Sequence, residues 1–186
     1  MINKENFENY LSSIIQQDYI VEKSMNYSLL AKSKRLRPLL LLNLLKDFNV
    51  DETIGYPFGS SLEMVHTYSL IHDDLPAFDN DDYRRGKLTN HKKFNEATAI
   101  LAGDSLLNSA YNIIIEDIAN SEDEQEKAKK TEALYELSYG IDRMIAGEYI
   151  DTEYEGKQIS SEYLEYMHEN KTGALIKAAV RIGAIL

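Results

Sequence analysis

The sequence contains no cysteine and no tryptophan, and it has only three prolines and nine glycines in 186 residues. Without cysteine there is neither a disulfide framework nor a thiolate metal site, which is typical of a reducing compartment, so a cytoplasmic location is expected. The longest apolar run, around residues 38–45, is interrupted by Asn43 and is too short to cross a bilayer. The polar start MINKENFENYL does not resemble a secretory signal.

Positive charge is also scarce. The chain carries 20 Lys and Arg residues against 31 Asp and Glu residues, a formal net charge of −11 at pH 7. Nucleic-acid-binding proteins usually present a basic face, so this balance argues against a nucleic-acid partner. An acidic protein that binds anions needs metal ions or a local basic cluster.

The few helix breakers leave room for long helices, and apolar residues recur with the helical period in most of the chain. Ser60 and Glu63 have the spacing of a capping box and predict a helix start there. Further helices are predicted over about 93–118, near 125–147, and from about Ser161 after a turn at Gly156. No segment alternates convincingly with period two. The prediction is therefore a single all-α domain over residues 1–186.

The C-terminal segment KTGALIKAAVRIGAIL ends at Leu186 inside an apolar helical pattern, without a glycine cap or a closing polar turn. One interpretation is an ordinary terminal helix that docks on the core. The other, which we favour, is that the chain stops early and forms the N-terminal part of a longer domain.

The stretch HDDLPAFDNDDYRRG, residues 72–86, contains five aspartates followed by two arginines. Like charges this close repel one another, which suggests that the stretch holds a cation. His66, Ser69 and Asp73 share one face of the preceding helix, although a histidine at such a position is by itself more often a satisfied core residue. A bend at Pro76 would bring Asp79 back toward Asp73.

Three converging carboxylates, from Asp73, Asp74 and Asp79, would suit Mg²⁺, which prefers hard oxygen ligands and shares its remaining positions with water and substrate phosphate. A calcium loop is excluded because, counting from Asp79, the sixth position is Arg84 instead of glycine and the twelfth is Asn90 instead of glutamate. A solvated acidic turn is the simpler alternative.

Basic residues cluster in the segment KSKRLRP, which supplies Lys32, Lys34, Arg35 and Arg37. Arg85 and Lys171 add positive charge elsewhere. Binding a substrate with diphosphate groups would need both Mg²⁺ held by carboxylates and hydrogen bonds from Lys and Arg side chains.

These blocks together resemble the trans-isoprenyl diphosphate synthase family, and within it most closely the bacterial farnesyl diphosphate synthases. DDLPAFD is similar to the first aspartate-rich motif of that family, in the form with two inserted residues. KRLRP, EMVHTYSLIHDD, ILAGDSLL and KTGALI are similar to further blocks in the same order. The resemblance covers nearly the whole chain.

The resemblance implies an all-α fold of the isoprenoid-synthase type around a deep cavity. It implies that Asp73, Asp74 and Asp79 hold the Mg²⁺ that binds the allylic diphosphate substrate. It further implies that this pocket is completed by Arg84, Lys171 and Thr172. It assigns the diphosphate of isopentenyl diphosphate to Lys34, Arg37, His66 and Arg85.

The sequence departs from the family pattern in three places. Lys32 and Ser33 stand where relatives carry two glycines, and Glu148 stands near the allylic site where many carry glutamine. The second aspartate-rich motif is absent, since nothing after Leu175 is Asp or Glu. The 186-residue chain is therefore expected to have little synthase activity by itself.

The expected activity is condensation of isopentenyl diphosphate with dimethylallyl or geranyl diphosphate to farnesyl diphosphate. Tyr68, five residues before Asp73, is expected to obstruct the growing product, and geranylgeranyl diphosphate is the alternative product. A terpene cyclase has no need of the basic cluster. A non-catalytic partner subunit of the same fold stays open, and relatives are commonly homodimers.

Overall fold

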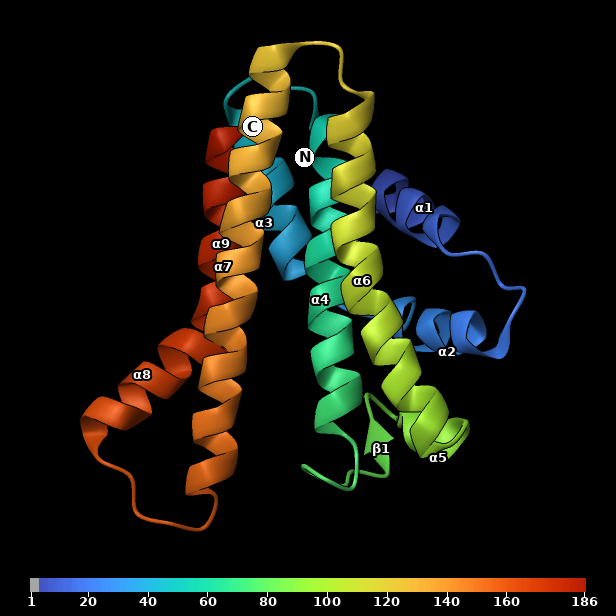
Figure 1. Cartoon of the computed structure of the whole chain (residues 1–186), viewed down its shortest axis with the longest axis vertical. Coiled ribbons are helices and arrows are strands. Elements are labelled where there is room, and N and C mark those ends of the chain that lie inside the picture. Colours follow the sequence, from blue (N-terminus) through green and yellow to red (C-terminus); the bar gives the residue numbers. More distant parts are fainter. Residues whose placement is uncertain (1–3) are drawn as a thin grey trace.

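The computed structural model describes residues 4–186, and helices make up most of this part of the chain (Figure 1). The elements in chain order are α1 (Lys4–Ile14), α2 (Ile20–Leu29), α3 (Leu36–Asp47), η1 (Glu52–Gly55), α4 (Tyr56–Asp73), β1 (Tyr83–Arg84), β2 (Lys87–Leu88), α5 (Asn90–Lys93), α6 (Glu96–Asn120), α7 (Glu124–Tyr154), α8 (Ser161–Lys171) and α9 (Gly173–Ile185). The predicted all-α class is confirmed.

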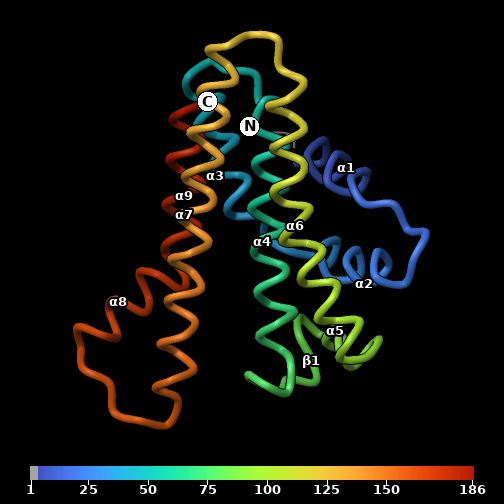
Figure 2. Tube along the Cα trace, viewed as in Figure 1, coloured from blue at the N-terminus to red at the C-terminus, as the bar shows by residue number. Residues whose placement is uncertain are grey.

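Two pairs of long helices form the body of the molecule (Figure 1). Helix α4 packs along α6, α7 packs along α9, and α3 joins the pairs by contacting both α4 and α9. The tube in Figure 2 shows α1 and α2 as an arm outside α6. Large side chains from these helices are fully buried and form one core, including Phe58, Leu62 and Met64 of α4, Leu106 and Ile114 of α6, and Leu137 of α7.

The helix boundaries differ from the sequence prediction at two places. Helix α4 begins at Tyr56 with Pro57 in its first turn, so the predicted start at Ser60 is wrong. Pro57 lacks an amide hydrogen, which costs nothing in a first turn, and Glu63 is paired with Arg35 instead of capping the helix. Helix α7 continues past residue 147 to Tyr154.

Within residues 4–186 the only strands are the two-residue β1 and β2, which pair antiparallel as a small hairpin. The turn between them has Arg85 at φ 52° and Gly86 at φ 77°, the left-handed values that tight hairpin turns require. This hairpin brings the Arg84 side chain to Asp74 at the end of α4. Across the same residues, no helix is sufficiently long and apolar to traverse a bilayer.

Candidate functional site

The chain turns sharply where α4 ends. The Asp79 N–H donates a hydrogen bond to the carbonyl of Asp73 (2.9 Å), and the Asn80 N–H donates to Leu75 (3.1 Å). Pro76 stops the helix because it has no amide hydrogen and its ring disfavours helix in the preceding residue. The predicted bend is therefore present, and it returns Asp79 to the neighbourhood of Asp73.

Asp73, at the end of α4, interacts with Glu148 of α7. Burial, followed by the interaction with Glu148 and the charge of Asp79, raises the pKa of Asp73 to about 7, and Lys171 acts in the opposite direction. The two carboxyl groups therefore compete for positive charge, which a proton or a cation can provide.

Lys171 lies against the same acidic group from the end of α8. Its ammonium is 2.9 Å from Glu148 Oε2, and it also contacts Asp151. Burial favours the neutral amine, but hydrogen bonds to Asp151 and Glu148 outweigh it and raise the pKa of Lys171. Gly147 makes this approach possible, because a Cβ at that position would lie 2.1 Å from the Lys171 backbone nitrogen.

Asp74 is engaged differently from its neighbour. Its buried carboxylate accepts a hydrogen bond from Arg84 Nε at 2.6 Å. Burial raises the pKa of Asp74, whereas Arg84 opposes that shift. Among the described residues, no group of three or more His, Cys, Asp or Glu side chains is arranged to hold a metal ion, and the Asp74 carboxylate is engaged by Arg84.

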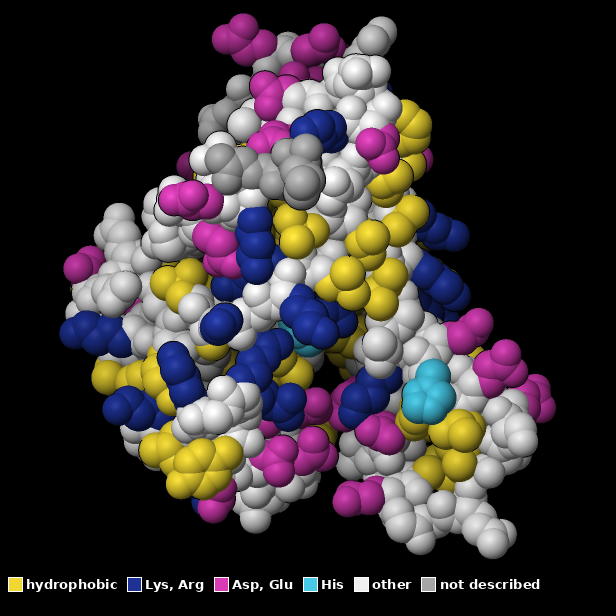
Figure 3. All heavy atoms as spheres, turned by 180° about the vertical axis from the view of Figure 1, so that it is seen from behind, with side chains coloured by type: hydrophobic (Ala, Val, Ile, Leu, Met, Phe, Trp, Pro, Cys, Tyr) yellow, Lys and Arg dark blue, Asp and Glu magenta, His cyan; other side chains and the backbone are white. Residues whose placement is uncertain are grey.

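A basic cavity opens at the start of α3. Figure 3 shows Lys and Arg side chains gathered around a hollow in the middle of one face. The cavity has a volume of about 450 Å³. It is lined by Lys32, Ser33, Lys34, Arg35, Leu36, Arg37, Glu63, His66 and Arg85. The structure thus brings the four residues expected to bind the isopentenyl diphosphate together.

His66 is neutral in this cavity. Burial, followed by the charges of Arg37 and Arg85, lowers the pKa of His66 from 6.5 to about 3. Burial also lowers the pKa of Arg37, and its Nε is buried without a hydrogen-bond partner among the described residues. Uncompensated buried donors and crowded positive charges are features that a bound anion relieves.

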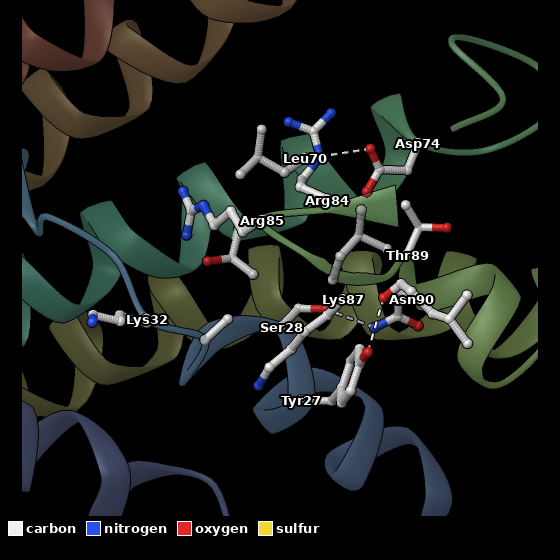
Figure 4. Close-up of a pocket in the computed structure, with 14 residues that line it drawn as sticks. Tyr27, Ser28, Lys32, Leu70, Asp74, Arg84, Arg85, Lys87, Thr89 and Asn90 are labelled. Atoms are coloured by element: carbon white, nitrogen blue, oxygen red, sulfur yellow. Dashed lines mark hydrogen bonds and ion pairs between the residues drawn. The ribbon is translucent and has the colours of Figure 1, made fainter. Parts of the chain in front are cut away.

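Arg84 and Arg85 point in different directions, although they are adjacent in sequence. Figure 4 shows the Arg84 guanidinium directed at Asp74, while the Arg85 guanidinium extends to the other side. Arg85 also lines the basic cavity. The hairpin therefore assigns one arginine to the acidic turn and the other to the basic cavity.

Tyr68 lies on α4 and belongs to the buried core. Its ring packs edge-on against His72, with centroids 5.8 Å apart, and its hydroxyl is buried without a partner in the described part of the chain. Burial, then the interactions with Tyr111 and Asp142, raises the pKa of Tyr68 to about 12. A neutral aromatic ring therefore stands one to two turns before Asp73. Thr172 lies at the junction of α8 and α9.

The reasoning from sequence missed one contributor to the site and gave another the wrong role. Asp151 binds Lys171 together with Glu148, and its position three residues after Glu148, on the same helix face, was an available signal. Arg35 was counted among the basic residues available to a ligand, but its guanidinium is buried against Glu63. No local pattern distinguishes Arg35 from Lys34 and Arg37.

The comparisons with known proteins identify the family of the chain. The polyprenyl synthetase family model matches residues 18–186. The chain is 48% identical over 166 residues to a farnesyl diphosphate synthase of Micrococcus luteus, covering 89% of this chain and 56% of that protein. It is 45% identical over 188 residues to a farnesyl diphosphate synthase of Bacillus subtilis (strain 168), covering 98% and 62% respectively.

A geranylgeranyl pyrophosphate synthase from Catharanthus roseus is 40% identical over 192 residues, which cover 100% of this chain and 53% of that protein. Among solved structures, an FPP/GFPP synthase from Zymomonas mobilis superposes with a TM-score of 0.88 at 32% identity, covering 97% of this chain and 66% of that one. The chain thus spans between 53% and 62% of the length of these three curated relatives.

Proposed function

Since the chain belongs to the polyprenyl synthetase family, we propose that it acts in the Mg²⁺-dependent condensation of isopentenyl diphosphate with an allylic diphosphate. One observation carries the proposal. The site has two separate regions that suit anions: an acidic turn with Lys171, and a basic cavity. Arg84 lies at the acidic turn and Arg85 lines the basic cavity. Two substrates that each end in a diphosphate require this duplication.

The residues at the acidic turn fit a magnesium ion. Asp73 and Asp79 offer only hard oxygen donors, and burial, followed by the interaction with Glu148 and the charge of Asp79, raises the pKa of Asp73. Mg²⁺ keeps several waters and needs only one or two carboxylates besides substrate phosphate. Asp73 and Asp79 are the proposed ligands, and Asp74 contributes by holding Arg84.

The reaction begins with heterolysis of the allylic carbon–oxygen bond, whose electrons stay with the departing diphosphate. Mg²⁺ held by Asp73 and Asp79 would neutralise that negative charge, and Arg84, Lys171 and Thr172 are the residues proposed to add to this neutralisation. Lys34, Arg37, His66 and Arg85 hold the second substrate by its diphosphate. Its double bond then attacks the allylic cation, and loss of a proton to the released diphosphate restores a double bond.

The proposed product is farnesyl diphosphate, which is the product that the names of the Micrococcus and Bacillus relatives state. Tyr68 stands five residues before Asp73, about 7.5 Å along the axis of α4, and it is the proposed obstacle to a tail that grows down this helix. The longer geranylgeranyl product is the second candidate, because a relative of that name is 40% identical.

We infer a cytoplasmic homodimer. The absence of cysteine supports a reducing compartment. Helix α6 exposes Ile100, Leu101 and Ile115 at 44%, 53% and 52%, and a second copy of the chain is the proposed occupant of that face. Sedimentation analysis of the wild-type chain and of Leu101→Glu tests the dimer, which the charged variant should dissociate.

Calorimetric titration of the 186-residue chain tests the function. A non-hydrolysable allylic diphosphate analogue should bind only with Mg²⁺, whereas isopentenyl diphosphate should bind without it. Arg85→Ala should weaken isopentenyl diphosphate by about 10- to 100-fold, the scale of a charge-assisted hydrogen bond, and should leave the allylic analogue nearly unchanged. Equal loss of both ligands would contradict the division into two pockets.

Turnover of geranyl and isopentenyl diphosphate separates catalysis by this chain from a role as a binding partner. Residues 176–186 contain no Asp or Glu, and the proposed function of these 186 residues alone therefore relies on the acidic turn at Asp73 and Asp79. Turnover is expected to lie far below about 1 s⁻¹, since one lost electrostatic contact can cost about 10²–10³ in rate. Turnover near that value would favour catalysis by the chain alone.

A further inference from the structure

Arg35 has an unusual backbone at the edge of the basic cavity. It occupies the residue before α3 with φ 53° and ψ 40°, a left-handed conformation that side chains other than glycine and asparagine rarely adopt. Such a conformation persists only where surrounding contacts determine it. At this position the contacts come from the arginine side chain itself.

The Arg35 guanidinium is almost completely buried, with 2% of its side chain exposed. Nη1 donates to Glu63 at 2.7 Å, and Nε and Nη2 donate to Glu8 at 3.0 and 3.2 Å. Nη2 also donates to the Leu29 carbonyl at 2.9 Å. One side chain thus ties the segment 30–35 to α1, α2 and α4.

Arg35 also lines the basic cavity, but its guanidinium donates to Glu8, Glu63 and the Leu29 carbonyl. Lys34 and Arg37 line the basic cavity together with His66. Glu63 also lines this cavity, and it lies one helical turn before His66 on α4. A buried carboxylate at that place repels an anion unless a partner cancels its charge, and Arg35 is that partner.

We propose that Arg35 is a positioning residue for the basic cavity, which holds Lys34 and Arg37 in place and cancels the charge of Glu63. The inference rests on the proposed function only in taking isopentenyl diphosphate as the ligand of the cavity. Arg35 touches no substrate in this role. It acts through the residues on either side of it and through Glu63.

The role makes a selective prediction that a merely structural ion pair does not. Loss of a structural ion pair lowers the stability of the whole chain and weakens the binding of both ligands or of neither. Loss of Arg35 as a positioning residue weakens isopentenyl diphosphate specifically, since Lys171 and Asp73 are held by α4, α7 and α8 instead.

The test uses two variants of the 186-residue chain and one matched control. Arg35→Met leaves Glu63 buried and unpaired, whereas Arg35→Met/Glu63→Gln removes both buried charges and keeps the volumes similar. Arg181→Met/Glu136→Gln removes an ion pair between α9 and α7 that lines no part of the basic cavity. Titrations use isopentenyl diphosphate and, with Mg²⁺, the non-hydrolysable allylic analogue, and urea unfolding monitors the fold.

Arg35→Met should weaken the binding of isopentenyl diphosphate by about 10-fold or more, which is the effect of an unpaired buried charge. The affinity for the allylic analogue should be nearly unchanged. The double variant should recover part of this loss but remain weaker than wild type, because the segment is no longer held. If Arg35→Met does not fold, the selective loss in the double variant carries the test. The Arg181 control should bind both ligands normally.

Loss of both ligands in equal measure, unchanged isopentenyl diphosphate binding, or no recovery in the double variant when Arg35→Met folds would overturn the inference. These outcomes differ from failure of the proposed function. In that case the wild-type chain itself would bind neither isopentenyl diphosphate nor the allylic analogue.

Discussion

Replacing Gly147 by alanine tests the closest backbone contact at the site. A Cβ at this position would lie 2.1 Å from the Lys171 nitrogen, 2.7 Å from its Cα and 2.8 Å from the Asn170 carbonyl carbon. Ordinary contact begins at 3.4 Å, so the methyl group is about 1.3 Å too close. All three obstructing atoms are backbone atoms, and no rotation of a side chain can clear them.

The strain must therefore move α7 away from the junction of α8 and α9. Overpacking of this kind costs about 1–3 kcal/mol, and the upper end is expected because the obstacle is backbone. With a urea dependence of about 2 kcal/mol per molar, the unfolding midpoint falls by about 1 M or more. Lys171 also moves relative to Glu148, and binding of the allylic analogue should weaken by about 10-fold or more, since a shift near 1 Å disrupts positioning strongly.

Gly173→Ala is the matched control two residues beyond Lys171. A Cβ there meets nothing closer than the His168 carbonyl at 3.7 Å, so this variant should be as stable as wild type or gain up to about 1 kcal/mol. Urea unfolding followed by circular dichroism, with calorimetry of the allylic analogue, measures both effects. A Gly147→Ala chain with the wild-type midpoint and affinity would refute the contact.

Three further predictions address single groups at the site. The pKa of His66 is lowered in the folded chain, so the stability that its neutral form contributes above pH 6.5 is lost as the pH falls toward 3. In urea unfolding between pH 7 and 4.5, His66→Gln should therefore reduce the fall of the unfolding midpoint with decreasing pH. An unchanged fall would mean that another group causes the acid sensitivity. Asp73→Ala and Asp79→Ala should each weaken Mg²⁺-dependent binding of the allylic analogue by about 10-fold or more, since each removes a hard ligand, and calorimetry showing unchanged affinity in both would exclude the acidic turn as the metal site. Tyr68→Ala, in an active form of the enzyme, should lengthen the product seen by chromatography, and an unchanged product distribution would remove Tyr68 from the path of the chain.

The sequence alone determined the fold class and the bend that follows α4. Helical periodicity and few breakers predicted an all-α chain, and the turn at Gly156 and the helix from Ser161 are confirmed. The bend at Pro76 was predictable because proline imposes it locally. Residue types at fixed spacing also brought His66 and Asp73 onto one helix, since both lie on α4.

Tertiary structure decided which charged groups meet. Asp151 and Glu148 of α7 bind Lys171 of α8. The close approach of the two helices at Gly147, where a Cβ would lie 2.1 Å from the Lys171 backbone nitrogen, permits this contact. That approach depends on packing between residues that are far apart in sequence. Arg35 and Arg37 are two residues apart and both line the cavity. The Arg35 guanidinium is paired with Glu63, whereas Arg37 Nε has no hydrogen-bond partner in the described part of the chain. Their side chains are chemically identical, and only the left-handed backbone at Arg35 and the position of α4 separate their roles.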